Sequence, residues 1–210
     1  MTGTRQRRRG VLLAGGASSR FGGVAKGLLP LGAMRLADAA LAALRETCDD
    51  VVIAANDDTA EFWFREHPVV RDAEAGRGAL GALETALLAG DGANVVVCAW
   101  DMPFMTADVL EQLAQAVEAG ANACVPVRAD ASSEPLCAAY APSCAAVAST
   151  LLARGERSAQ ALWREVGGAS WDIDTMLTPE RAARTFFNVN TPDDLRRAEA
   201  WVFPFVIRST

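Results

Sequence analysis

Histidine is almost absent from this sequence, in which His67 is the only one among 210 residues. This scarcity excludes a histidine-rich metal site, and it leaves a single candidate base for a Ser-His or Cys-His nucleophile pair. We expect His67 itself to lie at the surface, just before a strand. Long hydrophobic runs are also missing, since the apolar stretch 11–14 that follows the N-terminal arginines is too short for a signal peptide or a membrane span.

Paired cysteines and excess positive charge are lacking as well. The five cysteines are scattered and none belongs to a Cys-x-x-Cys pair, so neither a disulfide framework nor a zinc knuckle is indicated. A reducing cytoplasm is the simplest setting for such a chain. The formal net charge of −6 argues against nucleic acid or an anionic membrane as the main partner. We expect the arginines within residues 5–9 to form a solvated end that leads into the first strand.

Short apolar runs of strand length alternate with amphipathic segments along the chain. This pattern predicts a three-layer α/β fold in one domain, residues 1–210, with a mostly parallel sheet and helices on both faces. The expected strands are 11–14, 51–55, 68–71, 94–99, 121–127 and 186–189. The clearest helices are 34–48, 79–89, 107–119 and 192–202, whereas residues 134–174 look less regular. Ligands bind at the carboxyl ends of such strands, so the loops after the first four strands should share one crevice.

A glycine-rich loop follows the first expected strand. Four glycines lie within residues 15–23, where they let the backbone turn sharply and bring several N–H groups close to one anion. Arg20 and Lys26 add full positive charges at the same place. The loop is neither a P-loop nor a dinucleotide fingerprint, because it has no Gly-Lys-Ser/Thr and no Gly-x-Gly-x-x-Gly. It therefore predicts a phosphate cradle of another kind.

Three further polar residues follow expected strands. Asp101, shortly after the strand 94–99 and two residues before a proline, is suited to hold Mg²⁺, which prefers one or two carboxylates together with phosphate oxygens and water. Its alternative role is to cap the next helix. Asn56 and Asp72 come directly after the second and third strands. Taken alone, each is more typical of a turn residue than of a ligand contact.

The run LAGGxSSRFGxxxKxLL, from Leu13 to Leu29, resembles the signature loop of the molybdenum cofactor guanylyltransferase family, the MobA-like NTP transferases. The resemblance extends from about Gly10 to Trp201 without large insertions. It implies a Rossmann-like nucleotidyltransferase fold, the use of a nucleoside triphosphate with Mg²⁺, and the release of pyrophosphate.

The resemblance also implies roles for individual residues. It gives catalytic roles to Arg20, Lys26 and Asp101, and it assigns the metal to Asp101 and Asn190. Asn190 is equally typical of a turn beside the helix cap Thr191. The residues implied in nucleotide binding are Leu13, Ala14, Gly15, Gly16, Lys26, Asn56, Asp72, Gly78 and Asp101.

Two stretches are similar to the family less closely. The run GRGALGAL, residues 76–83, resembles the family's Gly-Pro-Leu-Ala-Gly stretch, with alanine in place of the proline. Within it, Arg77 is either a phosphate contact or a surface charge. The run Glu134-Pro135-Leu136 is similar to a Pro-Leu element on the acceptor side.

The function that these resemblances imply is transfer of GMP from GTP to the phosphate of the molybdopterin cofactor. Alternatives are CTP as the nucleotide or another acceptor such as a sugar phosphate. A non-catalytic nucleotide-binding module is a further alternative, because Ala25 stands where the family commonly has Asp before the loop lysine. A protein that delivers the cofactor would be an additional partner. We expect the apolar tail 201–207 to pack on the chain's own core.

Overall fold

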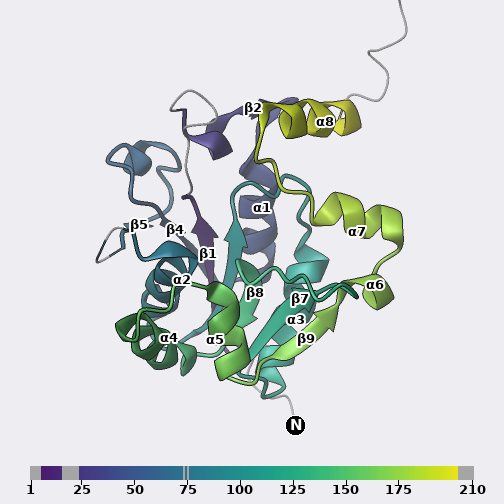
Figure 1. Ribbon diagram of the computed structural model, residues 1–210. Helices are drawn as coiled ribbons and strands as arrows, with labels where there is room; N and C mark the ends of the chain where they lie inside the picture. Colours follow the sequence, from purple (N-terminus) through teal and green to yellow (C-terminus); the bar gives the residue numbers. More distant parts are fainter. Residues whose placement is uncertain (1–5, 16–23, 73, 75, 203–210) are drawn as a thin grey trace, which may run out of the picture.

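The computed structural model describes residues 6–15, 24–72, 74 and 76–202. Its main sheet has seven strands in the order β5-β4-β1-β6-β8-β7-β9 (Figure 1). Their bounds are β1 Arg8–Leu13, β4 Asp50–Ala54, β5 Val69–Val70, β6 Asn94–Ala99, β7 Ala123–Val127, β8 Cys137–Tyr140 and β9 Ala169–Asp172. Only β8 runs antiparallel to its neighbours within this sheet, so the predicted mostly parallel architecture is confirmed.

Helices cover both faces of the sheet. On one face lie α1 (Asp38–Thr47) and α3 (Ala107–Glu118), and on the other lie α2 (Gly78–Ala89), α4 (Cys144–Ala153) and α5 (Ala159–Glu165) (Figure 1). The central strand β1 is buried between the two layers, because successive strand residues point to opposite faces. Val11 belongs to the core beneath α2, whereas Leu12 belongs to the core beneath α1 and α3.

A smaller substructure lies above the carboxyl end of β1 in Figure 1. It combines η2 (Lys26–Leu28), the hairpin of β2 (Pro30–Leu31) and β3 (Met34–Arg35), and the last helix, α8 (Pro192–Val202). Its core consists of Leu31, Leu36, Val189 and Ala198. The remaining short elements are η3 (Ala60–Phe62), α6 (Ile173–Met176) and α7 (Pro179–Thr185). None of the helices within the described ranges has the length and apolar character needed to cross a membrane.

Two element predictions match residue for residue, namely the strand 94–99 and the helix 192–202. The predicted strand 186–189 is wrong, because these residues pair with none of the strands of the sheet. Residues 186–189 instead form an irregular segment, and the N–H of Val189 donates to the carbonyl of Asp101 over 2.9 Å. The expected irregularity of 134–174 is also wrong, since this segment contains β8, α4, α5 and β9. Residues 203–207 of the apolar tail lie outside the described residues.

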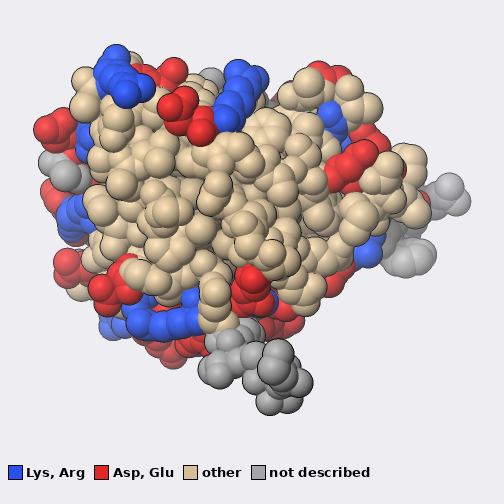
Figure 2. Space-filling view, turned by 90° about the horizontal axis from the view of Figure 1, so that it is seen from below, with Lys and Arg blue, Asp and Glu red and all other residues tan. Residues whose placement is uncertain are grey.

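Figure 2 shows the molecule from below, relative to the view of Figure 1. Few charged side chains lie near the middle of this face, and Lys and Arg are interspersed with Asp and Glu around its edge. Such a distribution provides no extended basic surface there, which nucleic acid would require.

The expectation that the N-terminal arginines are solvated is wrong for Arg8, whose side chain is 1% exposed. Its guanidinium donates to Glu118 Oε1 over 2.7 Å, to Glu111 Oε1 over 3.1 Å and to the carbonyl of Thr47 over 3.3 Å. The hydrogen bonds to the two carboxylates raise the pKa of Arg8 despite its burial. Arg8 therefore joins the start of β1 to both helices of one layer.

We predict that Arg8→Ala lowers the free energy of unfolding by about 2–4 kcal/mol, because it removes the buried guanidinium that donates hydrogen bonds to both Glu111 and Glu118. This loss lies toward the low end of what breaking a buried ion pair costs, since the carboxylates of Glu111 and Glu118 are both partly exposed. The matched control is Arg7→Ala, which removes an exposed partner of Asp50 and should cost less than about 1 kcal/mol. Urea denaturation measures both values. Equal losses in the two variants would contradict the role assigned to Arg8.

Candidate active site

A cavity of about 790 Å³ lies at the carboxyl ends of β1, β4 and β6. Every site residue predicted from the sequence that the structure describes lines it: Leu13, Ala14, Gly15, Lys26, Asn56, Asp72, Gly78, Asp101 and Asn190. Gly16 and Arg20 lie outside the described residues. The parallel strands explain this convergence, because loops distant in sequence leave the sheet along the same edge.

Lys26, Asp101 and Asn190 form the polar centre of the cavity. The Lys26 ammonium donates to Asp101 Oδ2 over 2.6 Å and to Asn190 Oδ1 over 3.1 Å. The side chains of Lys26 and Asp101 are only 12% and 16% exposed, so solvent screens their attraction weakly. The backbone hydrogen bond from Val189 to Asp101 brings Asn190 to this position. The end of β6 thus meets the segment before α8 and the start of η2.

The other oxygen of Asp101, Oδ1, is buried and has no hydrogen-bond partner among the described residues. A buried carboxylate oxygen without a donor is costly unless a cation or a ligand satisfies it. Together with the amide oxygen of Asn190, it fits Mg²⁺, which needs few protein ligands when phosphate and water complete its shell. Within the described ranges no group of three or more His, Cys, Asp or Glu residues could hold a metal by itself.

A second, smaller cavity of about 280 Å³ shares Asp101 with the first. Glu134 lines it together with Ser158 and Asn188. Burial raises the pKa of Glu134, Arg128 opposes this rise, and the nearby negative charge of Asp101 adds to it. The carboxyl groups of Asp101 and Glu134 therefore both line the smaller cavity, and Asp101 lines the larger one as well.

Asn56 and Asp72 join the loops that follow β4 and β5. The Asn56 amide nitrogen donates to Asp72 Oδ2 over 2.8 Å, and its oxygen accepts from the Asp72 N–H over 2.9 Å. Thr85 donates to Asp72 Oδ1 over 2.7 Å. Each carboxylate oxygen of Asp72 can still accept a further hydrogen bond from a ligand.

Arg77 is neither a surface charge nor a free cation. Its guanidinium lies 2.5 Å from Glu84 Oε2, and the Glu84 side chain is only 7% exposed. Ser149 of α4 donates to Glu84 Oε1 over 2.6 Å. A Cβ on Gly81 would lie 2.5 Å from Cβ of Arg77, so the glycine leaves room for this arrangement. The positive charge of Arg77 is thus compensated within the protein.

Two tryptophans that sequence reasoning did not assign to the site also line the larger cavity. The indole N–H of Trp100 donates to the carbonyl of Gly15 over 3.0 Å. A Cβ on Gly27 would lie 2.5 Å from Cδ2 of Trp100, so the ring packs directly on the backbone next to Lys26. Trp63 stacks on Trp100 with ring centroids 5.3 Å apart. The aromatic run 62–64 soon after β4 was the available signal for Trp63.

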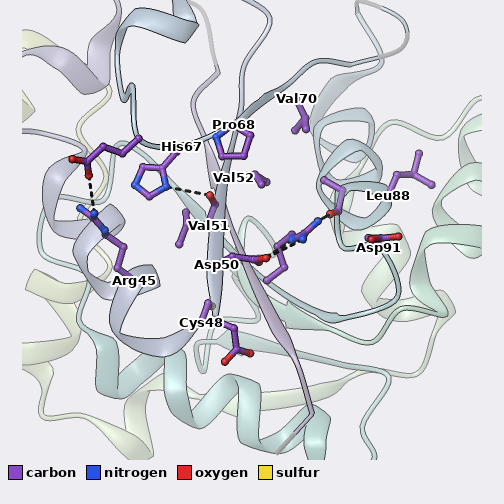
Figure 3. A pocket seen from close by; sticks show the side chains of 14 residues that line it. Arg45, Cys48, Asp50, Val51, Val52, His67, Pro68, Val70, Leu88 and Asp91 are labelled. Carbon is purple, nitrogen blue, oxygen red and sulfur yellow. Dashed lines mark hydrogen bonds and ion pairs between the residues drawn. The ribbon is translucent and has the colours of Figure 1, made fainter.

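The single histidine lies outside this site. His67 lines a separate cavity of about 770 Å³ beside the start of β4, together with Arg45 and Asp50 (Figure 3). It is half-buried rather than fully at the surface, and its Nδ1 lies 3.1 Å from the carbonyl oxygen of Val51. His67 therefore does not contact the polar centre at Asp101.

Comparison with known proteins identifies similar chains. The family model of the MobA-like NTP transferase domain matches residues 10–169. The molybdenum cofactor guanylyltransferase of Desulfosudis oleivorans is 27% identical over 91% of this chain and 94% of its own length. The probable molybdenum cofactor guanylyltransferase of Chloroflexus aggregans is 33% identical over 92% of this chain and 94% of its own.

Solved structures agree in fold. Molybdopterin-guanine dinucleotide biosynthesis protein A from Archaeoglobus fulgidus has a TM-score of 0.77 and 27% identity, covering 94% of this chain and 100% of that one. The 2-C-methyl-D-erythritol 4-phosphate cytidylyltransferase from Thermus thermophilus has a TM-score of 0.62 over 91% of this chain and 97% of that one. Since its identity is only 18%, this second likeness concerns the fold alone.

We predict that Gly27→Ala lowers the free energy of unfolding by about 1–3 kcal/mol, because the added methyl group overlaps the Trp100 ring. The matched control is Gly15→Ala, whose Cβ would have no described atom within 4 Å and should change stability by less than about 0.5 kcal/mol. Denaturant titration followed by indole fluorescence measures both. A Gly27 variant as stable as the Gly15 variant would show that this packing is not tight.

Proposed function

The chain belongs to the MobA-like NTP transferase family, and on that premise we propose that it transfers GMP from GTP to the phosphate of the molybdopterin cofactor. The observation that carries the proposal is the cavity in which Lys26, Asp101 and Asn190 meet at the carboxyl edge of the sheet. Relatives named as molybdenum cofactor guanylyltransferases, matched over nine-tenths of this chain, support the choice of nucleotide and acceptor.

In this reaction an oxygen of the acceptor phosphate attacks the α-phosphorus of GTP. The new bond joins that oxygen to the α-phosphorus, the bond between the α-phosphorus and the β-phosphate oxygen breaks, and pyrophosphate leaves. No general base is required, because the acceptor phosphate is already ionised at neutral pH. The protein has to position the reactants and neutralise charge.

Each polar residue has a proposed task in this scheme. Lys26 neutralises phosphate charge, and Arg20, outside the described residues, is proposed to assist it. Asp101 and Asn190 would hold Mg²⁺, which supplies further charge neutralisation on the phosphates when bound. The backbone of the loop from Leu13 to Gly16 is proposed to cradle phosphate.

We propose that the acceptor enters on the side of the smaller cavity. This cavity and the larger one share Asp101, so an acceptor phosphate there can approach a nucleotide phosphate held at the same carboxylate. Glu134 lines this cavity, and burial raises the pKa of its carboxyl group, so the ionised form is less favoured there than in water.

We also propose a cytoplasmic setting and a partner protein that delivers the cofactor. The five cysteines are all buried and form no disulfide bonds with one another, which suits a reducing compartment. Ala25 lines the larger cavity and packs against the apolar core. Its side chain has no polar group to orient Lys26, so the hydrogen bonds of Lys26 to Asp101 and Asn190 are proposed to do so.

We predict that pyrophosphate is released from GTP in the presence of Mg²⁺ and molybdopterin, and at most slowly from CTP or UTP. An assay with each nucleotide in turn measures this preference. Turnover with CTP alone would overturn the guanylyl assignment. Tight GTP binding with no release from any nucleotide would instead establish a non-catalytic binding module.

We predict that Asp101→Asn lowers Mg²⁺-dependent turnover by about 100-fold or more, because it removes the charge of the proposed metal ligand. Thermal unfolding should show a folded variant, since the amide can still contact Lys26. The matched control is Asp58→Asn, which neutralises a fully exposed carboxylate and should leave turnover unchanged. Wild-type rates in the Asp101 variant would remove this residue from the mechanism.

A further inference from the structure

Trp63 and Trp100 form an aromatic wall in the larger cavity. Trp100 is 3% exposed, whereas Trp63 is half-buried, and the planes of the two rings are 27° apart. The buried ring thus backs the more exposed one. A tryptophan with one side supported and part of its surface open to a cavity is suited to contact a flat ligand.

The Trp63 ring is held in place by its neighbours. Its indole N–H donates to Thr59 Oγ1 over 3.0 Å, and Thr59 in turn donates to Asp57 Oδ1 over 2.6 Å. Arg35 donates to the carbonyl of Trp63 over 2.8 Å. Because the only polar group of the indole is already bonded, Trp63 offers a ligand its aromatic surface rather than a hydrogen bond.

The distribution of charge in the cavity fixes which part of a nucleotide meets this wall. Lys26 and Arg77 are the cations among the described residues that line the cavity, and each is paired with a carboxylate. Arg77 is bound by the buried Glu84, whereas Lys26 contacts the two proposed Mg²⁺ ligands, Asp101 and Asn190. The triphosphate is therefore directed to Lys26 and Asp101. The base then lies against the other walls of the cavity. The segment after β4 contributes both Asn56 and Trp63 to these walls.

We propose that Trp63 stacks on the purine base of the nucleoside triphosphate and favours purine over pyrimidine nucleotides. This inference rests on the proposed function and deepens it by naming a specificity-determining residue of the same site. A two-ring purine overlaps an indole more extensively than a one-ring pyrimidine does, and stacking on an aromatic side chain strengthens with overlap.

The test measures binding of GTP, CTP and inorganic tripolyphosphate, each with Mg²⁺, by calorimetry. Trp63→Ala should weaken GTP binding by about 5-fold to 100-fold, weaken CTP binding less, and leave tripolyphosphate binding unchanged. Trp63→Phe keeps a ring and should retain most of the GTP affinity. The matched control is Phe62→Ala, which removes an aromatic ring of η3 that is 68% exposed and does not line the cavity. It should bind all three ligands as the wild type does.

A spectroscopic readout accompanies the affinities. GTP should quench the indole fluorescence of the wild type, and Trp63→Phe should lose much of that quenching. Unchanged GTP affinity in Trp63→Ala, or an equal loss for GTP and tripolyphosphate, would overturn the proposal. The assay needs no acceptor, so a wild type that binds GTP but never releases pyrophosphate refutes the proposed function and still tests the stacking.

Discussion

The contact between Lys26 and Asp101 is the interaction on which the site depends. It spans 2.6 Å and joins two parts of the chain that are 75 positions apart, and Asn190 extends it to the segment before the last helix. The chain carries a formal net charge of −6, so most of its surface repels a polyanion. A triphosphate can bind only where that sign is locally reversed. Lys26 contributes positive charge here but is paired with Asp101, and the unpartnered oxygen of Asp101 leaves room for a divalent cation that would supply the positive excess.

The sheet places these groups together. Leu13 of β1 pairs with Ala99 of β6 and with Ala54 of β4, so the polar residues after these strands leave the sheet at one level. Trp100 then fastens the first loop, because its indole N–H binds the carbonyl of Gly15 and its ring packs on Gly27. At the other end of β1, Arg8 ties the strand to α1 and α3. The central strand is therefore anchored at both ends.

Much of this arrangement follows from the sequence, because apolar strands and strand-end polar residues are local patterns. The strand 94–99 and the convergence of Asp101 with Lys26 belong to this predictable part. The rest depends on distant partners. Burial of Arg8 requires Glu111 and Glu118, about a hundred positions away, and no local pattern reveals that pairing. The alanine-rich segments of β8 and α4 lack the polar contrast that identifies a strand or a helix. Residues 186–189 look like a strand in composition, yet they pair with no strand of the sheet, and composition alone does not reveal a missing partner.

The most direct test of the account is a crystal structure with a non-hydrolysable GTP analogue and Mn²⁺, in which anomalous scattering locates the metal. The account predicts the metal on Oδ1 of Asp101, the triphosphate at Lys26 and the base toward Asn56. A nucleotide bound instead in the cavity beside His67, or a metal that does not touch Asp101, would contradict it.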